Sequence, residues 1–284
     1  MKNIKINQNF QLLIFIHIPK TAGTTLSDVL KQQYKKSDII TIHGTVEENV
    51  EKFQEKYYQN QNTVRLIKGH MTYGLHKVLD CPYTYITVLR NPVSRIISVY
   101  YYLLQSNLHP QHHLVKGKTL AEFVSSGTAH NNGQTRFIAG QYNPSDRGQS
   151  INLLERAKNN LKENFTVVGL TERFDETLML LKRKLDWVYM PLYVKQNKSK
   201  KPDKATITED TVTLIQNQNS LDIELYQYAT EIFEHRLSLE NYYFKKGLKK
   251  FLLLNKIYQP VGQVSSKARL ILFMFKSGNK NRQN

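Results

Sequence analysis

The sequence contains a single cysteine, Cys81, in its 284 residues. A lone cysteine cannot form a disulfide within the chain, which fits a reducing compartment without excluding export. Long apolar stretches are also missing, because the run from Leu12 to Ile18 is only strand-sized and a membrane-spanning helix needs about 20 apolar residues. The N-terminal residues are polar and lack the apolar core of a signal peptide. We therefore expect a soluble, cytoplasmic protein.

Acidic residues are few compared with basic ones. Asp and Glu number 23 against 40 Lys and Arg, which gives a formal net charge of +17. Such an excess attracts anionic partners, namely nucleic acid, phosphorylated cofactors, acidic lipids or acidic glycans. The hydrophobic fraction of 40% is sufficient for a buried core. The composition thus predicts a globular protein with an anionic partner, but it does not identify that partner.

The C-terminal segment 241–284 has no acidic residue and carries ten Lys and Arg residues among apolar clusters. We divide the chain into an α/β domain at 1–240 and this basic extension, which belongs to the same domain or lies beside it. One interpretation of the extension is a peripheral helical subdomain with a solvated basic face. The other is a surface that docks on an anionic membrane, which would make the protein peripheral to the membrane.

The hydrophobic pattern predicts alternating strands and helices, which is typical of an α/β domain with a parallel sheet. Strands are expected at Leu12–Ile18, Ile39–Ile42, Val64–Lys68, Thr84–Arg90 and Phe165–Gly169. Helices are expected at Glu47–Asn60, Val93–Leu104, Leu120–Ser125, Ile151–Asn160, Phe174–Leu185 and Asp222–His235, and a further helix follows the first strand. The simplest organisation is one α/β domain with a helical C-terminal part.

The first informative segment is the turn after the first predicted strand, residues 18–26, IPKTAGTTL. A turn between a parallel strand and a helix offers backbone N–H groups and the positive helix end to an anion. Gly23 permits a close approach of the backbone to a ligand, and Lys20 adds a positive charge. The segment is not a Walker A loop, because its lysine precedes the glycine and no later strand ends on an obvious acidic partner for magnesium. We predict a phosphate site without a metal.

The second informative segment is VLRNPVSRIISVY at residues 88–100. Asn91 and Pro92 predict the start of a helix, since asparagine caps helices and proline suits the first turn. Arg90 then ends a strand at the carboxyl edge, where open α/β sheets bind ligands. Ser98 lies about two turns along the helix. An arginine fork and a hydroxyl that converge on one point suit a monoester phosphate.

Together these segments resemble the sulfotransferases that use 3′-phosphoadenosine 5′-phosphosulfate (PAPS). HIPKTAGTTL is similar to their 5′-phosphosulfate-binding loop, and LRNPVSRIISVYYY is similar to their 3′-phosphate-binding motif. The resemblance is strongest to the carbohydrate-modifying family that includes heparan sulfate 2-O-sulfotransferases and bacterial relatives. Further similarity lies in KGH (68–70), NGQTRF (132–137) and VGLTERFD (168–175), so that the resemblance covers roughly residues 12–200.

The resemblance implies a P-loop-NTPase-like three-layer α/β sandwich, in which helices flank a central parallel sheet. It implies in-line transfer of the sulfuryl group from PAPS to a hydroxyl of a carbohydrate, with 3′-phosphoadenosine 5′-phosphate (PAP) as the second product. It implies no metal. The acceptor would be an anionic or a neutral glycan, and no nucleic-acid partner is expected.

The resemblance also implies roles for individual residues. Lys20 matches the lysine that stabilises the negative charge growing on the leaving group. Arg90 and Ser98 match the ligands of the 3′-phosphate. His70 is the candidate base, because a neutral imidazole suits that role and the base of the family stands in a similar Gly-His context. The 5′ side of the cofactor would be bound by Lys20, Thr21, Ala22, Gly23, Thr24, Thr25 and Leu26.

Other residues are weaker candidates. Gln134 and Arg136 fall where the family places contacts near substrate and cofactor, although a structural pair at a helix end is the alternative. His76 is a further candidate for the substrate site if its loop folds inward. Heparan sulfate 2-O-sulfotransferases carry a histidine at the place of Lys68, which leaves open the hydroxyl that is modified. His17 is expected to be a core residue of the first strand.

Two other functions stay open at this point. A P-loop-related kinase that acts on a small molecule would share the first loop but would depend on Mg²⁺. A basic nucleic-acid-binding protein would explain the net charge, although the lysines are dispersed and no recognised nucleic-acid motif appears.

Overall fold

The computed structural model describes residues 12–42, 46–127, 131–141, 152–195 and 207–262. Within these residues five strands form one sheet in the order β2-β3-β1-β4-β5, and all neighbouring strands are parallel. The strands are β1 (Leu12–Ile16), β2 (Ile39–Ile42), β3 (Leu66–Gly69), β4 (Tyr83–Leu89) and β5 (Phe165–Leu170). Every residue of β1 is buried, as expected of a central strand in a sheet covered on both faces.

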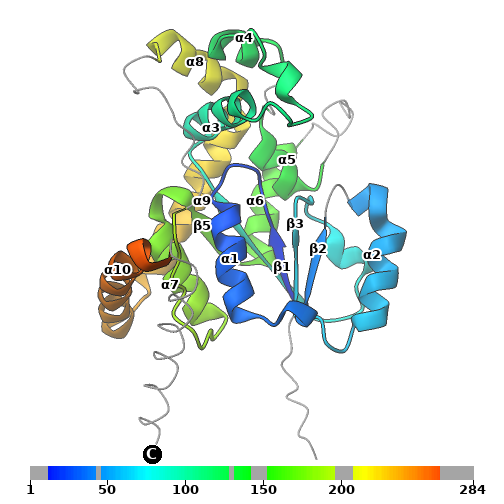
Figure 1. Cartoon of the computed structure of the whole chain (residues 1–284), viewed down its shortest axis with the longest axis vertical. Coiled ribbons are helices and arrows are strands. Elements are labelled where there is room, and N and C mark those ends of the chain that lie inside the picture. The colour runs from blue at the N-terminus through cyan, green and yellow to red at the C-terminus, as the bar shows by residue number, and fades with distance from the viewer. Residues whose placement is uncertain (1–11, 43–45, 128–130, 142–151, 196–206, 263–284) are drawn as a thin grey trace, which may run out of the picture.

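Helices flank the sheet on both faces. They are α1 (Gly23–Gln33), α2 (Val46–Asn60), α3 (Pro92–Gln105), α4 (Leu120–Ser125), α5 (Gly133–Ala139), α6 (Leu153–Asn164), α7 (Phe174–Lys184), α8 (Glu209–Gln218), α9 (Ser220–Ser238) and α10 (Tyr242–Gly262). In Figure 1, α1 lies in front of the sheet and α6 lies behind it. The predicted three-layer α/β sandwich with a helical C-terminal part is confirmed.

The register of the sheet brings several strand ends to one edge. Ile16 of β1 pairs with Gly69 of β3 and with Thr87 of β4. His70 and Arg90 therefore follow their strands at the same edge as the loop after β1. This carboxyl edge is where open α/β sheets bind ligands.

The predicted strands all form, and their ends lie within two residues of the expected ones. The start of α3 is also confirmed: the side chain of Asn91 accepts a hydrogen bond from the backbone N–H of Ser94 at 3.1 Å, and Pro92 is the first helical residue. Two helices that the hydrophobic pattern does not predict are α5 and α8. Both are short, and α8 buries only Ile215, so neither has a strong periodic signal.

The described part of the predicted C-terminal extension packs against the rest of the protein. Helix α10 buries Phe244, Phe251 and Tyr258 in the same core as the sheet. No helix in the described residues is both long enough and apolar enough to cross a bilayer. Residues 263–284 lie outside the described residues, and docking on an anionic membrane stays a prediction.

Candidate active site

A cavity of about 550 Å³ opens at the carboxyl edge of the sheet. Four of the side chains that line it are cationic, and no described lining residue is acidic. A cavity of this size and sign suits an anionic ligand as large as a nucleotide. The residues that the sequence predicts for the site and that line the cavity are Lys20, Ala22, Gly23, Thr24, Thr25, His70, Arg90 and Ser98.

The N-terminal end of α1 faces this cavity without a cap. The helix has no capping side chain and no acidic residue in its first turn. Its first internal hydrogen bond runs from the N–H of Leu26 to the carbonyl of Ala22 at 3.1 Å. The N–H groups of Gly23, Thr24 and Thr25 consequently have no partner within the helix. An anion in the cavity would meet these donors and the positive end of the helix dipole.

The backbone between β1 and α1 is strained. Lys20 and Ala22 have φ angles of 69° and 64°, in the left-handed region that residues with a Cβ enter at a cost of about 1–2 kcal/mol. Hydrogen bonds to the four successive carbonyl groups of residues 17–20 hold this shape. Thr21 supplies one of them, from its own hydroxyl to the carbonyl of Ile18 at 2.9 Å.

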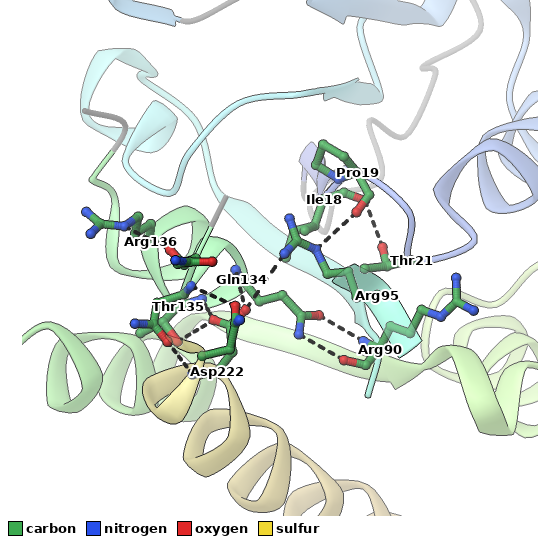
Figure 2. Close-up of polar contacts among 12 residues, drawn as sticks. Ile18, Pro19, Thr21, Arg90, Arg95, Gln134, Thr135, Arg136 and Asp222 are labelled. Carbon is green, nitrogen blue, oxygen red and sulfur yellow. Dashed lines mark hydrogen bonds and ion pairs between the residues drawn. The ribbon is translucent and has the colours of Figure 1, made fainter. Parts of the chain in front are cut away.

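Two arginines, Arg95, which is fully buried, and Arg90, which is half-buried, supply two more of these hydrogen bonds. Arg95 donates through Nε to the carbonyl of Pro19 at 3.2 Å, as Figure 2 shows, and Arg90 donates through Nη1 to the carbonyl of Lys20 at 3.0 Å. Burial lowers the pKa of both guanidinium groups. The contact between Arg90 and Lys20 joins the two predicted phosphate segments directly, so they belong to one cavity rather than to two surfaces.

His70 provides the fourth hydrogen bond, from Nδ1 to the carbonyl of His17 at 2.7 Å. A carbonyl oxygen only accepts, so Nδ1 carries the hydrogen and the neutral ring keeps its lone pair at Nε2. The side chain is exposed at the end of β3 and lines the cavity. This tautomer leaves Nε2 able to accept a proton, which is what the predicted role as a base requires.

His17 differs from its prediction as a core residue. Strand β1 ends at Ile16, the residue before His17, and the half-buried ring of His17 lines the cavity. This ring lies against the ring of His70, with the two centroids 4.2 Å apart. Burial, followed by the charges of His70, Lys68 and Lys20, lowers the pKa of His17 from 6.5 to about 3. The ring of His17 also explains why position 23 is a glycine, because a Cβ at that position would lie 1.9 Å from Cδ2 of His17.

The lowered pKa of His17 predicts a loss of stability in acid. As the pH falls below 6.5 the unfolded chain takes up a proton at His17, whereas the folded protein does not until the pH reaches about 3. Each pH unit in this window costs about 1.4 kcal/mol. Between pH 6.5 and 4.5, the free energy of unfolding measured in urea should therefore fall by roughly 2 kcal/mol more in the wild type than in His17→Asn. An equal fall in both proteins would contradict the buried neutral state.

Arg90 and Ser98, the two residues of the second predicted phosphate site, both line the cavity, and Ser98 is buried on α3. Nε of Arg90 is buried and has no hydrogen-bond partner among the described residues, so it is a donor that a ligand can use. Gln134 does not line the cavity. Its side chain instead accepts from the backbone N–H of Arg90 at 2.9 Å and donates to the carbonyl of Arg90 at 2.8 Å (Figure 2).

The structure does not bring every candidate to the cavity. The hydroxyl of Tyr85 lies 3.0 Å from both Nδ1 and the backbone nitrogen of His76, and the ring of His76 stacks on Tyr83. These contacts hold His76 beside the first half of β4, away from the carboxyl edge. Arg136 donates through Nε to the carbonyl of Asn131 at 3.3 Å, and in Figure 2 it lies on the far side of Gln134 from Arg90.

Thr21 and Leu26, which the resemblance places on the 5′ side, are buried and do not line the cavity. Thr21 acts on the loop through its contact with Ile18. Leu26 packs in the core below the first turn of α1. Their predicted part in cofactor binding is thus limited to shaping the loop and the helix start.

Tyr102 also lines the cavity. Nζ of Lys20 lies 4.0 Å from the centroid of the Tyr102 ring, within the range of a cation–π contact. His109 lies edge-on to the same ring at 5.5 Å and also lines the cavity. Tyr102 lies on α3, two residues beyond the second segment, but nothing in its sequence context indicates a partner 82 residues away.

Helix α10 supports another wall of the cavity, which contains Tyr193 and Lys195. Asn255 accepts a hydrogen bond from the N–H of Tyr193 at 3.0 Å. Gln259 accepts one from the N–H of Lys195 at 3.1 Å and donates one to the carbonyl of Tyr193 at 2.8 Å. The described part of the basic extension therefore supports a wall of the cavity.

Comparisons with known proteins identify the family of the chain. A family model described as galactose-3-O-sulfotransferase matches residues 3–241. Human heparan-sulfate 6-O-sulfotransferase 1 is 26% identical in an alignment that covers 84% of this chain and 68% of that protein. Heparan sulfate 2-O-sulfotransferase 1 of Xenopus laevis is 26% identical, over 78% of this chain and 70% of that protein.

A crystal structure of mouse sulfotransferase SULT7A1 complexed with PAP has 14% identity and a TM-score of 0.41, and the match covers 75% of this chain and 66% of that chain. The family model, in contrast, matches well over half of the sequence. The chain belongs to the galactose-3-O-sulfotransferase family, which confirms the predicted assignment to the carbohydrate sulfotransferases.

Proposed function

We propose that this protein transfers the sulfuryl group of PAPS to a hydroxyl of a glycan by in-line displacement. The observation that carries the proposal is the contact between the two phosphate segments, in which Nη1 of Arg90 donates to the carbonyl of Lys20 at 3.0 Å inside one cationic cavity. A nucleotide with a phosphate at each end of its ribose matches two anion sites that share a cavity. Neither a small-molecule kinase nor a nucleic-acid-binding protein requires both of these anion sites.

The donors of the cavity fit PAPS. The uncapped N–H groups at the start of α1 would hold the 5′-phosphosulfate, and Lys20 would stand beside them. Arg90, through its unpartnered Nε, and the hydroxyl of Ser98 would hold the 3′-phosphate. PAPS would supply a sulfuryl group attached to a phosphate leaving group.

Different residues would act as the base and as the group that stabilises the leaving oxygen. Nε2 of His70 would accept the proton of the attacking hydroxyl, because its Nδ1 hydrogen is engaged by the carbonyl of His17. The ammonium of Lys20 would stabilise the negative charge that grows on the leaving oxygen, which is greater in the transition state than in the ground state. The low pKa of His17 keeps that neighbouring ring neutral at working pH, so it adds no positive charge that competes with proton uptake by His70.

Binding of PAP should be independent of metal ions. With EDTA present and PAP at about 100 times its Kd, the folded protein should gain about 2.7 kcal/mol, which corresponds to a rise in Tm of roughly 5 °C. A thermal melt measures this shift. Stabilisation by ATP with Mg²⁺ but not by PAP would favour a small-molecule kinase, and binding of DNA with steep salt dependence but no response to PAP would favour a nucleic-acid-binding protein.

The acceptor we propose is a glycan, either anionic or neutral. We rank heparan sulfate first among the candidates, followed by glycans that carry galactose, because the relatives and the family model are named for these acceptors. Incubation with PAPS that carries labelled sulfate and a panel of such glycans should label at least one of them. Label that appears only on tyrosyl peptides or small metabolites would exclude the carbohydrate acceptor while leaving sulfuryl transfer intact.

A further inference from the structure

A buried carboxylate on α9 connects the two phosphate sites. Asp222 is fully buried, and its two oxygens accept hydrogen bonds at the start of α5. Oδ1 accepts from the N–H of Thr135 at 2.7 Å and from its hydroxyl at 2.8 Å, while Oδ2 accepts from the N–H of Gln134 at 3.1 Å (Figure 2). Because α5 has no capping side chain of its own at Asn132, Asp222 serves as the acceptor for its first turn.

The first connection from Asp222 leads to the loop that carries Lys20. Nη1 of Arg95 lies 3.9 Å from Oδ2 of Asp222, and Nε of the same guanidinium donates to the carbonyl of Pro19, the residue before Lys20. Arg95 is only 1% exposed, and its guanidinium packs on Gly133, where a Cβ would lie 2.8 Å from Nη2. The orientation of Arg95 is therefore fixed from two sides, and it holds the strained loop by its backbone.

The second connection leads to Arg90. Asp222 fixes the first turn of α5, and from that turn the buried side chain of Gln134 makes both of its hydrogen bonds with the backbone of Arg90. Arg90 stands after the end of β4, where no further strand pairing holds its backbone. Gln134 thus replaces the missing strand partner and aims the guanidinium at the cavity.

We propose that Asp222 is a positioning residue for both phosphate sites, acting on the 5′ site through Arg95 and on the 3′ site through Gln134. This inference rests on the proposed use of PAPS. It assigns a function to a residue outside both phosphate segments and outside every motif that the sequence analysis singles out. It also gives a role to a buried acidic residue that stands behind a cationic cavity without lining it.

The two connections can be tested separately with fragments of the cofactor. Titration calorimetry would measure the Kd of PAP, adenosine 5′-monophosphate and adenosine 3′-monophosphate. Arg95→Lys keeps a charge beside Asp222, but the shorter fork-less side chain cannot also reach the carbonyl of Pro19. The Kd of PAP and of the 5′-monophosphate should therefore rise about tenfold, and the Kd of the 3′-monophosphate should rise less than about threefold. Gln134→Met should show the opposite pattern, with a higher Kd for PAP and the 3′-monophosphate and little change for the 5′-monophosphate.

Asp222→Asn should raise the Kd of all three ligands. If that variant does not fold, Arg95→Lys and Gln134→Met still test the inference. Arg236→Met is the matched control, because Arg236 lies on α9 and holds the carbonyl of Phe165 at the opposite edge of the sheet, at 3.0 Å. It should change none of the three Kd values. Equal weakening of both monophosphates by Arg95→Lys and by Gln134→Met, or no weakening by either, would overturn the inference. A wild type that binds none of the ligands would instead refute the proposed function.

Discussion

Replacement of Lys20 with alanine is expected to lower turnover about 10³-fold while changing the Kd of PAP less than about threefold. The reason lies in when the charge appears. PAPS already carries its ground-state charges, which the N–H groups of α1, Arg90 and Ser98 would share, whereas the leaving oxygen becomes negative only as the bond to sulfur breaks. An ammonium that stabilises this developing charge contributes to the rate and not to nucleotide affinity.

The structure explains why Lys20 can be specific to that step. Its φ of 69° and its contact with Tyr102 direct the side chain into the cavity rather than along the loop. Steady-state kinetics with the glycan acceptor, together with calorimetric binding of PAP, separate the two effects. Lys31→Ala, which removes an exposed lysine of α1 that pairs with Asp28, is the control and should leave both parameters unchanged. Unchanged turnover in Lys20→Ala would remove Lys20 from the mechanism.

Replacement of Arg90 with alanine is expected to raise the Kd of PAP roughly 100-fold. The variant loses the charge-assisted hydrogen bonds that a guanidinium makes to a phosphate, and Lys20 loses the donor to its carbonyl. Adenosine 5′-phosphosulfate lacks the 3′-phosphate, so its affinity should fall much less, by about threefold. That remaining loss would reflect the loosened loop.

Comparing the Kd of PAP with that of adenosine 5′-phosphosulfate separates the contribution of the 3′-phosphate to binding. Arg183→Ala, which breaks an ion pair with Glu240 far from the cavity, should bind both nucleotides as the wild type does. If Arg90→Ala weakened PAP and adenosine 5′-phosphosulfate to the same extent, Arg90 would be a structural residue and the 3′-phosphate would have to be bound elsewhere.

Both junctions of the site could be predicted from the sequence because their signals are local. The apolar run that forms β1 leads directly into Lys20 and Gly23, and Asn91 with Pro92 marks the start of α3 after Arg90. Two such segments in this order resemble the motifs of the sulfotransferases, and that resemblance implies one nucleotide site. Parallel pairing of β1 with β4 then brings them together.

The parts that could not be predicted depend on contacts between distant residues. Asp222 lies 88 positions from Gln134, and a buried aspartate in a helix looks, in sequence, like any solvent-facing one. His17 was expected in the core because the apolar run continues past it, but β1 ends at Ile16 and the ring turns to the cavity. His76 was a candidate only for an inward loop, and the hydroxyl of Tyr85 holds it elsewhere.

The most direct test is a crystal structure of the complex with PAP. We expect the 5′-phosphate within hydrogen-bond distance of the N–H groups at the start of α1, and the 3′-phosphate on Arg90 and Ser98, with one molecule spanning both. A complex in which PAP occupies only one of these places, or binds on another face of the sheet, would contradict the account.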